Sequence, residues 1–492
     1  MKTCVIIGGG IGGLVAGALL AKEGYQVTVL EKNAIIGGGL QTFKRHGVSF
    51  PTGMHIFGGF QEGGNLCKIF EYLSVMDEIS LRATDDKASD VITVMGEGET
   101  YCLPQGKEHF IAYLAEKFPV EKEHIKAYID RLFELSEEED LFYLRETNGD
   151  HLSHSDDFLG SVNQLRDRYI SDPKLIALLG YLNPLFGGDP QTTPAYIHAL
   201  LSTLHINGTF QFVGESQQLA DALAKVIEKA DGQVIANEEV IRIEVENHQV
   251  TGVLTSKSHR YQAESYISDV HPDMLLRIID PQAFSTAFKS RIQSVPETMS
   301  SFKVFIKFKD KVFPYQNHAH FCPSHSDEWP RDIMFVTPPA SQQGEFAETM
   351  VIISPMEFGA VKPWENTHTG HRGEAYEQWK QEKTDMGLDF MKCLYPDFRN
   401  YSEFAFASSP LTIRDYYGNK EGSNYGFQKD SNNLMLSQMS VATKVRNLFL
   451  TGQNVNIHGL CGVLLTAIET VEALVGHNAI VRKINKFWSD KP

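Results

Sequence analysis

The chain has 492 residues, 42% of them hydrophobic and 22% charged, which is an ordinary globular composition with ample material for a core. This length predicts roughly two to four domains. Lys and Arg number 45 against 62 Asp and Glu, giving a net charge of −17, and so acidic a chain repels a phosphate backbone, which excludes a general nucleic-acid binder.

The first 31 residues predict a strand, a glycine-rich turn, a helix and a second strand. Residues 3–7 form an apolar strand, the helix covers 11–23 and ends before Gly24, and residues 26–30 form the second strand. The pattern Gly-x-Gly-x-x-Gly between strand and helix permits a sharp turn and leaves room for a diphosphate at the helix N-terminus. We therefore predict cofactor contacts at Gly8, Gly10, Ile11, Gly12 and Gly13.

Glu31 stands at the end of the second strand, 18 residues after Gly13. A carboxylate at this position accepts hydrogen bonds from both ribose hydroxyls and repels a 2′-phosphate. The turn and Glu31 serve the ADP half of either NAD or FAD, so both cofactors stay open on this evidence alone.

Two further cofactor-like patterns lie far along the chain. A helical pattern near 214–231 leads into strands at 234–235, 240–245 and 250–255, and we include Val240 among the cofactor-binding residues. An apolar strand at 447–450 precedes a loop and then a helix from about Val463, whose positive end would face the cofactor. The predicted contacts in this C-terminal part are Gly452, Gln453, Gly462 and Val463.

These patterns predict an α/β fold with a discontinuous Rossmann-like cofactor domain, a mixed-sheet substrate domain and a helical cap. The first long insertion is helix-rich and charged, whereas the second mixes strands, at 302–308 and 350–354, with aromatic loops. The predicted division is 1–75, 214–285 and 435–492 for the cofactor domain, 76–213 for the cap and 286–434 for the substrate sheet.

Several motifs resemble those of one group of flavoproteins, and this resemblance favours FAD. The spacing Glu31-x5-Gly37-Gly38 is similar to an extension in the amine oxidase and phytoene desaturase superfamily, and it implies cofactor contacts at Lys32, Gly37 and Gly38. The segments 448–453 and 459–463 look like the closing motif of that superfamily, and 46–55 is similar to the F-D-T-G-x-H stretch of retinol saturases and carotenoid isomerases. The chain thus resembles the phytoene desaturase, carotenoid isomerase and retinol saturase family of FAD-dependent oxidoreductases, closest to bacterial retinol saturase-like proteins.

The resemblance implies an enzyme that acts on CH–CH groups, by saturation, desaturation or isomerisation of a C=C bond in an apolar isoprenoid or polyene. The best single expectation is an activity like that of the all-trans-retinol 13,14-reductases. Pro51 and Asn454 stand where the family usually or often has Asp, which leaves the substrate open but not the cofactor. An amine-oxidase-type flavoprotein and a non-catalytic flavin-binding protein remain as alternatives.

His55 is the candidate catalytic residue, because the resemblance places it near the flavin and an imidazole delivers a proton near neutral pH. A histidine that only positions the cofactor by a hydrogen bond is the alternative, and both readings stay open. We expect a mostly apolar tunnel that ends near His55, with segments 181–186 and 210–213 in its lining.

The six cysteines are scattered without a Cys-x-x-Cys pair, which indicates a reducing compartment and no metal site. The apolar run 4–21 contains six glycines and no cleavage site, so we read it as neither a signal peptide nor a membrane span. A cytoplasmic protein is therefore expected. The amphipathic segment 480–488 leaves open both a docked terminal helix and peripheral membrane contact, and the electron donor or acceptor stays unknown.

Overall fold

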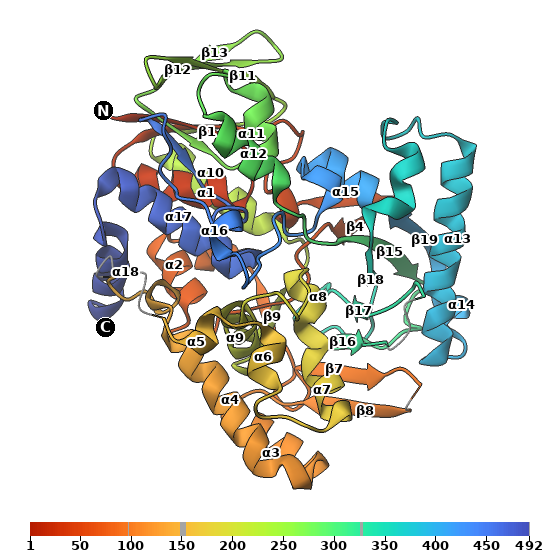
Figure 1. The fold of residues 1–492 in the computed structure, drawn as a ribbon. Coiled ribbons are helices and arrows are strands. Elements are labelled where there is room, and N and C mark those ends of the chain that lie inside the picture. Colours follow the sequence, from red (N-terminus) through yellow and green to blue (C-terminus); the bar gives the residue numbers. More distant parts are fainter. Residues whose placement is uncertain (97, 148–153, 325–327, 492) are drawn as a thin grey trace.

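A computed structural model describes residues 1–96, 98–147, 154–324 and 328–491. One end of the molecule is built on a five-stranded sheet in which all neighbouring strands run parallel. The strands come from three separated parts of the chain, as the discontinuous Rossmann-like fold predicts (Figure 1). Their spatial order is β10 (Gln233–Ile235), β2 (Gln26–Leu30), β1 (Thr3–Ile7), β14 (Ser265–Ser268) and β20 (Leu448–Leu450).

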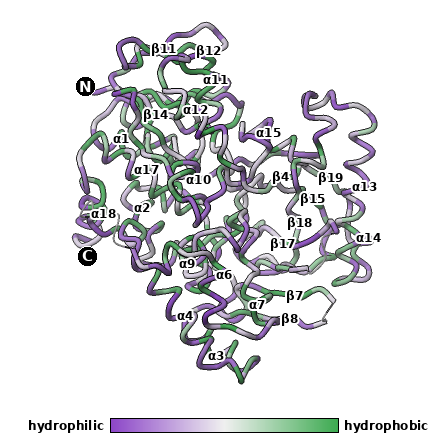
Figure 2. The backbone as a smooth tube through the Cα atoms, in the orientation of Figure 1, coloured by the Kyte–Doolittle hydropathy of each residue, from purple (hydrophilic) through white to green (hydrophobic). Residues whose placement is uncertain are grey.

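Helix α1 (Ile11–Lys22) packs beside two helices that come from distant parts of the chain, α10 (Gln217–Lys229) and α17 (Gly459–Val475). Ten of its twelve residues are buried, so it is apolar on all sides, as a helix enclosed by neighbours must be. A Cβ on its Gly17 would lie 2.8 Å from Ile227 Cδ1, which shows how closely α1 and α10 approach. In Figure 2, stretches of α1 and α17 in the upper half of the molecule are coloured green, which marks hydrophobic residues.

Helix α17 begins at Gly459, one turn earlier than the predicted start near Val463. Gly462, predicted to open the helix, lies inside it, and a Cβ there would sit 2.5 Å from the carbonyl oxygen of Ile457. The glycine therefore serves close packing inside the helix and does not mark the end of a loop. This corrects the predicted position of the helix N-terminus.

A seven-stranded mixed sheet forms the second half of the molecule. Its strands β7 and β16 pair in parallel and the other pairs are antiparallel. Two of the strands, β7 and β8, belong to residues 76–213, so this insertion is not wholly helical and shares a sheet with 286–434. The spatial order is β19 (Ser402–Ser408), β15 (Ser300–Phe308), β18 (Thr349–Met356), β17 (Ile333–Val336), β16 (Ala319–Cys322), β7 (Asp90–Val94) and β8 (Glu99–Leu103).

Among the described residues, the first insertion contributes seven α-helices. Figure 1 shows α3 and α4 at the end of the molecule opposite the small sheet of β11 (Val240–Glu246), β12 (Gln249–Thr255) and β13 (Arg260–Tyr261). The packing of the seven helices centres on α4 and α9, which lie against each other. The helices are α3 (Lys107–Lys117), α4 (Lys122–Glu137), α5 (Asp156–Leu159), α6 (Val162–Arg166), α7 (Pro173–Leu179), α8 (Asn183–Phe186) and α9 (Ala195–Ile206). The predicted boundaries of cap, sheet and cofactor domain stay a prediction.

The other described helices and strands complete the fold. Three small sheets contain β11 (Val240–Glu246), β12 (Gln249–Thr255) and β13 (Arg260–Tyr261); β3 (Thr42–Arg45) and β4 (Val48–Pro51); and β5 (Phe57–Gly58), β9 (Thr209–Phe212) and β6 (Leu81–Ala83). The remaining helices are α2 (Asn65–Tyr72), α11 (Pro272–Ile278), α12 (Thr286–Ser294), α13 (Glu374–Phe390), α14 (Phe398–Tyr401), α15 (Pro410–Tyr417), α16 (Leu434–Ser437) and α18 (Ala479–Ser489).

Helix α18 docks on the protein through Ile480, Val481 and Ile484, which are fully buried. Its hydrophobic face is therefore occupied in the structure, although Phe487 stays 41% exposed. Among the described residues no single helix has the length and apolarity to cross a membrane; α17 and α18 meet those criteria only together, and they bend by 112° where they join.

Candidate functional site

A cavity of about 1330 Å³ runs along the carboxyl ends of the parallel strands and on between the seven-stranded sheet and the helices of residues 76–213. Ligands of open parallel sheets bind at this edge. Cavities for small molecules usually measure about 300–1,000 Å³, so this cavity has room for a large cofactor and a second ligand.

The glycine-rich turn lines the cavity between β1 and α1. Gly8 adopts φ = +105°, a left-handed backbone conformation that favours glycine, and the chain turns there from the strand into the helix. Gly10 is the N-cap of α1, and a Cβ on Gly10 or Gly12 would come within 2.7 or 2.5 Å of the Asp269 carboxylate. Glycines at these two positions therefore leave room for the Asp269 carboxylate, and the N–H groups at the α1 N-terminus other than that of Gly13 suit a diphosphate.

Glu31 lies in the same lining at the end of β2 and is buried. Its Oε2 accepts a hydrogen bond from the Gly9 amide at 2.8 Å, and its Oε1 accepts one from the Asn33 amide at 2.8 Å. These two bonds fix the carboxylate beside the glycine turn. Since each carboxylate oxygen has a second lone pair, the group can still accept both ribose hydroxyls.

The paired glycines Gly37 and Gly38 pack directly on the first glycine turn. The Gly37 amide donates to the Gly9 carbonyl oxygen at 2.7 Å, and Gly10 and Gly37 form an isolated parallel bridge. A Cβ on Gly38 would lie 3.3 Å from Gly10 Cα. The two turns therefore form one glycine surface of the cavity.

Nearly all of the predicted cofactor residues lie in this lining. Gly13 and Gly37 are the exceptions, because both are buried behind it. Lys32 lines the cavity, but its Nζ donates to the Asp415 carbonyl oxygen at 3.0 Å and so ties β2 to α15. The predicted residues in the lining are Gly8, Gly10, Ile11, Gly12, Glu31, Lys32, Gly38, Val240, Gly452, Gln453, Gly462 and Val463.

Asp269 was missed by the sequence reasoning. It follows β14, and its Oδ2 accepts a hydrogen bond from the Gly13 amide at 2.9 Å. Burial raises the pKa of this carboxyl to about 7; the Gly13 hydrogen bond opposes the rise and Glu31 adds to it. An acidic residue directly after a buried parallel strand is the signal that could have found it.

His55 lies in the cavity wall as expected, and both of its ring nitrogens are inaccessible and without a hydrogen-bond partner in the described chain. Burial, with a smaller contribution from the charge of Lys303, lowers the pKa of His55 well below its usual range. The ring is therefore neutral at neutral pH and does not act as an imidazolium acid. It can still donate one N–H bond or accept one bond.

Lys303 on β15 is a second residue that the sequence reasoning missed. Its Nζ donates to the Thr52 carbonyl oxygen at 2.8 Å, and burial lowers the pKa of this amine to about 8. It faces the cavity close to His55. In a strand whose residues on both faces are buried, a lysine is exceptional, and that contrast is the signal in the sequence.

A buried polar cluster lies where Asn454 and His458 join the cavity. Lys429 donates to the Ser437 carbonyl oxygen at 2.9 Å, and burial lowers the pKa of its amine to about 7. Burial, followed by the charge of Lys429, lowers the pKa of His458 to about 3, so this ring is neutral. Asn454 Oδ1 accepts a hydrogen bond from the Phe427 amide at 2.9 Å, a bond that an Asp at this position would also accept.

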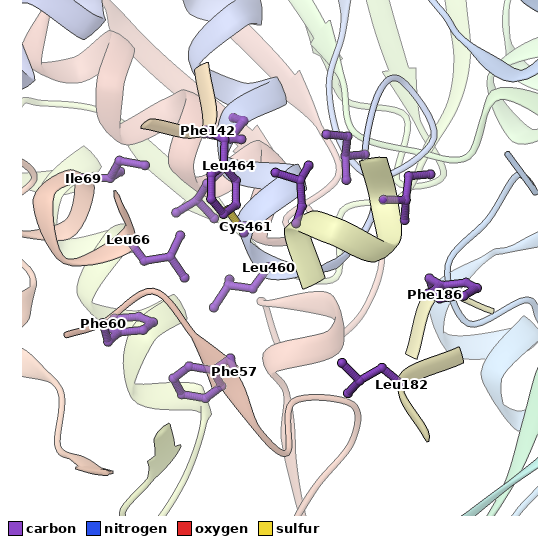
Figure 3. Packing of buried hydrophobic residues seen from close by; sticks show 14 of the residues in the cluster. Phe57, Phe60, Leu66, Ile69, Phe142, Leu182, Phe186, Leu460, Cys461 and Leu464 are labelled. Atoms are coloured by element: carbon purple, nitrogen blue, oxygen red, sulfur yellow. The ribbon is translucent and has the colours of Figure 1, made fainter. Parts of the chain in front are cut away.

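Apolar side chains form the part of the cavity next to the helices of residues 76–213. Figure 3 shows Phe57, Leu66 and Leu460, which come from three separate elements, gathered in one region of the core, and all three line the cavity. Residues of the predicted segment 181–186 also line it. Another part of the wall is charged and contains Arg331, Asp332, Glu357, Lys362 and Glu365.

The predicted segment 210–213 does not reach the cavity. It belongs mostly to β9, the middle strand of its small sheet. Phe212 packs against Phe57 with ring centroids 4.8 Å apart, and Phe210 packs against Phe60 at 6.2 Å. Since Phe57 lines the cavity, Phe212 supports the lining from behind.

The fold and the site together define a class of protein: oxidoreductases that bind a dinucleotide at the carboxyl edge of a discontinuous parallel sheet. The profile of the family described as "Flavin containing amine oxidoreductase" matches residues 11–474. The chain therefore belongs to this family of flavoproteins, and it is an FAD-dependent oxidoreductase. The glycine surface, the α1 N-terminus and the carboxylate of Glu31 fit the ADP half of FAD.

Three known proteins illustrate the similarity. The all-trans-retinol 13,14-reductase of Macaca fascicularis is 25% identical over 96% of this chain and 85% of its own length. Prolycopene isomerase 1, chloroplastic, of an Oncidium hybrid cultivar is 23% identical over 86% of this chain and 74% of its own. The crystal structure of an oxidoreductase from Methanosarcina mazei superposes with a TM-score of 0.67 at 17% identity, over 96% of this chain and all of that one.

Proposed function

We propose that this enzyme acts on a C=C bond of a long apolar isoprenoid or polyene, and that it saturates one double bond of a retinol-like substrate. The observation that carries the proposal is that the glycine-lined cofactor site and the apolar section near Phe57 and Leu460 belong to one cavity. A hydrocarbon chain needs such an apolar lining, and it must reach the cofactor for a hydride to pass between them. The retinoid and carotenoid names of the relatives support the same substrate class.

The protein residues at the junction hold a proton where the reaction needs one. Saturation of a double bond adds a hydride to one carbon and a proton to the other, and the hydride is the chemistry that bound, reduced FAD supplies. Lys303 Nζ holds a proton at neutral pH and, with a pKa of about 8, can release it. His55 is neutral and lies in the cavity wall close to Lys303. An external two-electron donor then reduces the cofactor again.

An amine oxidase is the second candidate, and one feature of the cavity favours it. Tyr417 and Tyr425 both lie in the wall, and the Tyr417 hydroxyl is so close to Gly53 that a Cβ there would lie 2.6 Å from it. A pair of aromatic rings beside the cofactor is what an amine substrate would need. The charged section of the wall would also accept a polar molecule.

The two candidates predict opposite behaviour of the visible flavin band. All-trans-retinol added without oxygen to the reduced holoenzyme should restore the oxidised band, and putrescine or benzylamine added to the oxidised holoenzyme should leave it unchanged. Bleaching of the oxidised band by an amine, together with no response to retinol, would replace the proposal by the amine oxidase reading.

A further inference from the structure

Three polar side chains meet in the wall of the cavity, away from the predicted cofactor residues. Asp90 is the first residue of β7, Tyr181 belongs to the short helix Gly180–Leu182, and His205 is near the end of α9. Asp90 Oδ2 accepts a hydrogen bond from the Tyr181 hydroxyl at 2.9 Å and one from His205 Nδ1 at 2.9 Å. All three residues are buried, and Tyr181 and His205 line the cavity.

The carboxylate fixes which nitrogen of His205 carries the proton. Because Asp90 Oδ2 accepts bonds, Nδ1 of His205 must donate, and in the neutral ring Nε2 then presents a lone pair. Nε2 has no hydrogen-bond partner in the described chain. Unlike the two ring nitrogens of His55, it is not sealed off from the cavity. His205 therefore offers one oriented acceptor to whatever occupies the space.

The surroundings of this acceptor are apolar. Phe321 on β16 packs edge-on against Tyr181, with ring centroids 5.0 Å apart, and lies 6.5 Å from His205. Leu201 and Leu204, on the same helix as His205, also line the cavity. A single acceptor in an apolar wall is the arrangement that recognises one polar group on an otherwise apolar ligand.

A purely structural role would leave this arrangement incomplete. The Asp90 and His205 bond does join β7 to α9, and an apolar pair could join them too. A polar atom at an enclosed apolar wall, however, loses hydrogen bonds to water unless a ligand or a bound water replaces them. The open Nε2 is the part of the pair that a structural role does not use.

We propose that the Asp90–His205 pair binds the terminal hydroxyl group of a long apolar substrate, with His205 Nε2 accepting the O–H hydrogen. Asp90 and Tyr181 position the ring. The inference rests on the proposed function, since it assumes that the apolar section of the cavity receives the hydrocarbon chain. Such a site selects isoprenoid alcohols over hydrocarbons and over ethers of the same shape. An ether oxygen carries no hydrogen, so its lone pair would face the lone pair of His205 Nε2.

The test compares two ligands that differ only at the end group. All-trans-retinol and retinyl methyl ether are titrated into the oxidised holoenzyme, and binding is followed by the perturbation of the flavin absorbance. We expect the alcohol to bind about 10- to 100-fold more tightly than the ether, the range set by a lost hydrogen bond and a buried acceptor left unpaired. Equal affinities, or tighter binding of the ether, would overturn the proposal without any variant.

Variants then assign the preference to this pair. His205→Phe keeps a ring of similar size and should abolish the preference, whereas Ser202→Ala, on the same helix and outside the cavity wall, should retain it. A preference that survives in His205→Phe would contradict the assignment. The readout is binding, so it separates the two claims: tight binding of alcohol without reduction refutes the proposed reaction only, and reduction without an alcohol preference refutes this inference only.

Discussion

Asp269 and the glycine turn place an ionisable carboxyl beside the expected position of two phosphates. Its folded-state pKa of about 7 lies above the ordinary value of 3.8, so the folded protein favours the protonated form. The stability that this proton provides is fully present below about pH 3.8 and is lost as the pH rises through about 7. A diphosphate nearby adds negative charge and favours the protonated form further.

FAD affinity should therefore fall as the pH rises through about 7 and above. Asp269→Asn keeps the shape and the acceptor for the Gly13 amide but cannot ionise, so its affinity should stay nearly constant over the same range. Titration of the apoprotein with FAD at several pH values, followed by quenching of the flavin fluorescence, measures both slopes. The exposed Asp231→Asn, with the same change of charge away from the cavity, is the control. If the FAD affinity of Asp269→Asn fell with pH as steeply as that of the wild type, the ionisation of Asp269 would not control FAD binding.

Glu31 should contribute directly to FAD affinity. Removal of its carboxylate in Glu31→Ala is expected to weaken FAD binding by about 1.5–3 kcal/mol, the usual range for hydrogen bonds to a charged group. Glu31→Gln retains one acceptor oxygen and should lose less. Because Glu31 also holds the Gly9 and Asn33 amides, thermal unfolding of the apoproteins must show that each variant is folded. Unchanged FAD affinity in Glu31→Ala would mean that Glu31 only stabilises the glycine turn and does not bind the cofactor.

Lys303 gives the proposed reaction a pH dependence of definite sign. Its pKa is lowered from 10.5 to about 8, so the ammonium form is present below about pH 8 and is lost above it. The lowered pKa also affects the free energy of unfolding. The contribution of the neutral Lys303 amine to stability is fully present above about pH 10.5 and is lost as the pH falls through about 8. In catalysis, the rate at which retinol reoxidises the reduced enzyme should fall above about pH 8 if Nζ is the proton source.

Lys303→Met should slow that reoxidation at pH 7 by about 10²- to 10⁴-fold, the usual contribution of a general acid, and should remove the fall above pH 8. His55→Gln keeps a hydrogen-bonding group, and a smaller change with the same pH profile is expected. Stopped-flow absorbance of the flavin band measures both rates. A profile in Lys303→Met that still falls near pH 8 would assign the proton to another group.

At the scale of single elements, the sequence predicted those strands and turns that are formed by residues close together in the chain. The strands Thr3–Ile7 and Gln26–Leu30, the glycine turn and the carboxylate Glu31 all lie within 31 residues of one another, and the structure has them where they were predicted. β7 was not predicted, although its antiparallel partner β8 follows it closely in the sequence; its place in a large sheet depends on β16, more than 220 residues away along the chain. The Asp90–His205 pair depends on the same distant packing.

The start of α17 shows a second limit of local pattern. A glycine in the sequence is compatible with a loop or with close packing, and only the neighbour decides between them. Gly462→Ala should destabilise the protein by about 1–3 kcal/mol, the usual cost of overpacking, because the added methyl group would meet the Ile457 carbonyl oxygen. Gly359→Ala, where a Cβ meets open space, should change the denaturant midpoint little. Equal midpoints for the two variants would contradict this account of Gly462.

At the scale of the whole molecule, the cavity is shared by interleaved parts of the chain, because the carboxyl edge of the parallel sheet, the seven-stranded sheet and the helices of residues 76–213 all line it. Much of the cofactor half was predictable, since its first and last pieces carry their own glycines, whereas Asp269 in the middle piece was missed. The substrate half was less so. Segment 181–186 reaches the cavity and segment 210–213 does not, although both are aromatic and apolar, because Phe212 and Phe210 pack on Phe57 and Phe60. Composition identified candidates for the lining, and tertiary packing selected among them.

A single turnover of the reduced holoenzyme tests the proposed saturation of a double bond most directly. The holoenzyme, reduced without oxygen by one equivalent of dithionite, is mixed with all-trans-retinol, and the flavin band and the mass of the retinoid are followed through a single turnover. We expect the oxidised band to return and the retinoid to gain two hydrogen atoms and lose one double bond from its conjugated chain. A flavin that stays reduced, with retinol recovered unchanged, would contradict the proposed saturation.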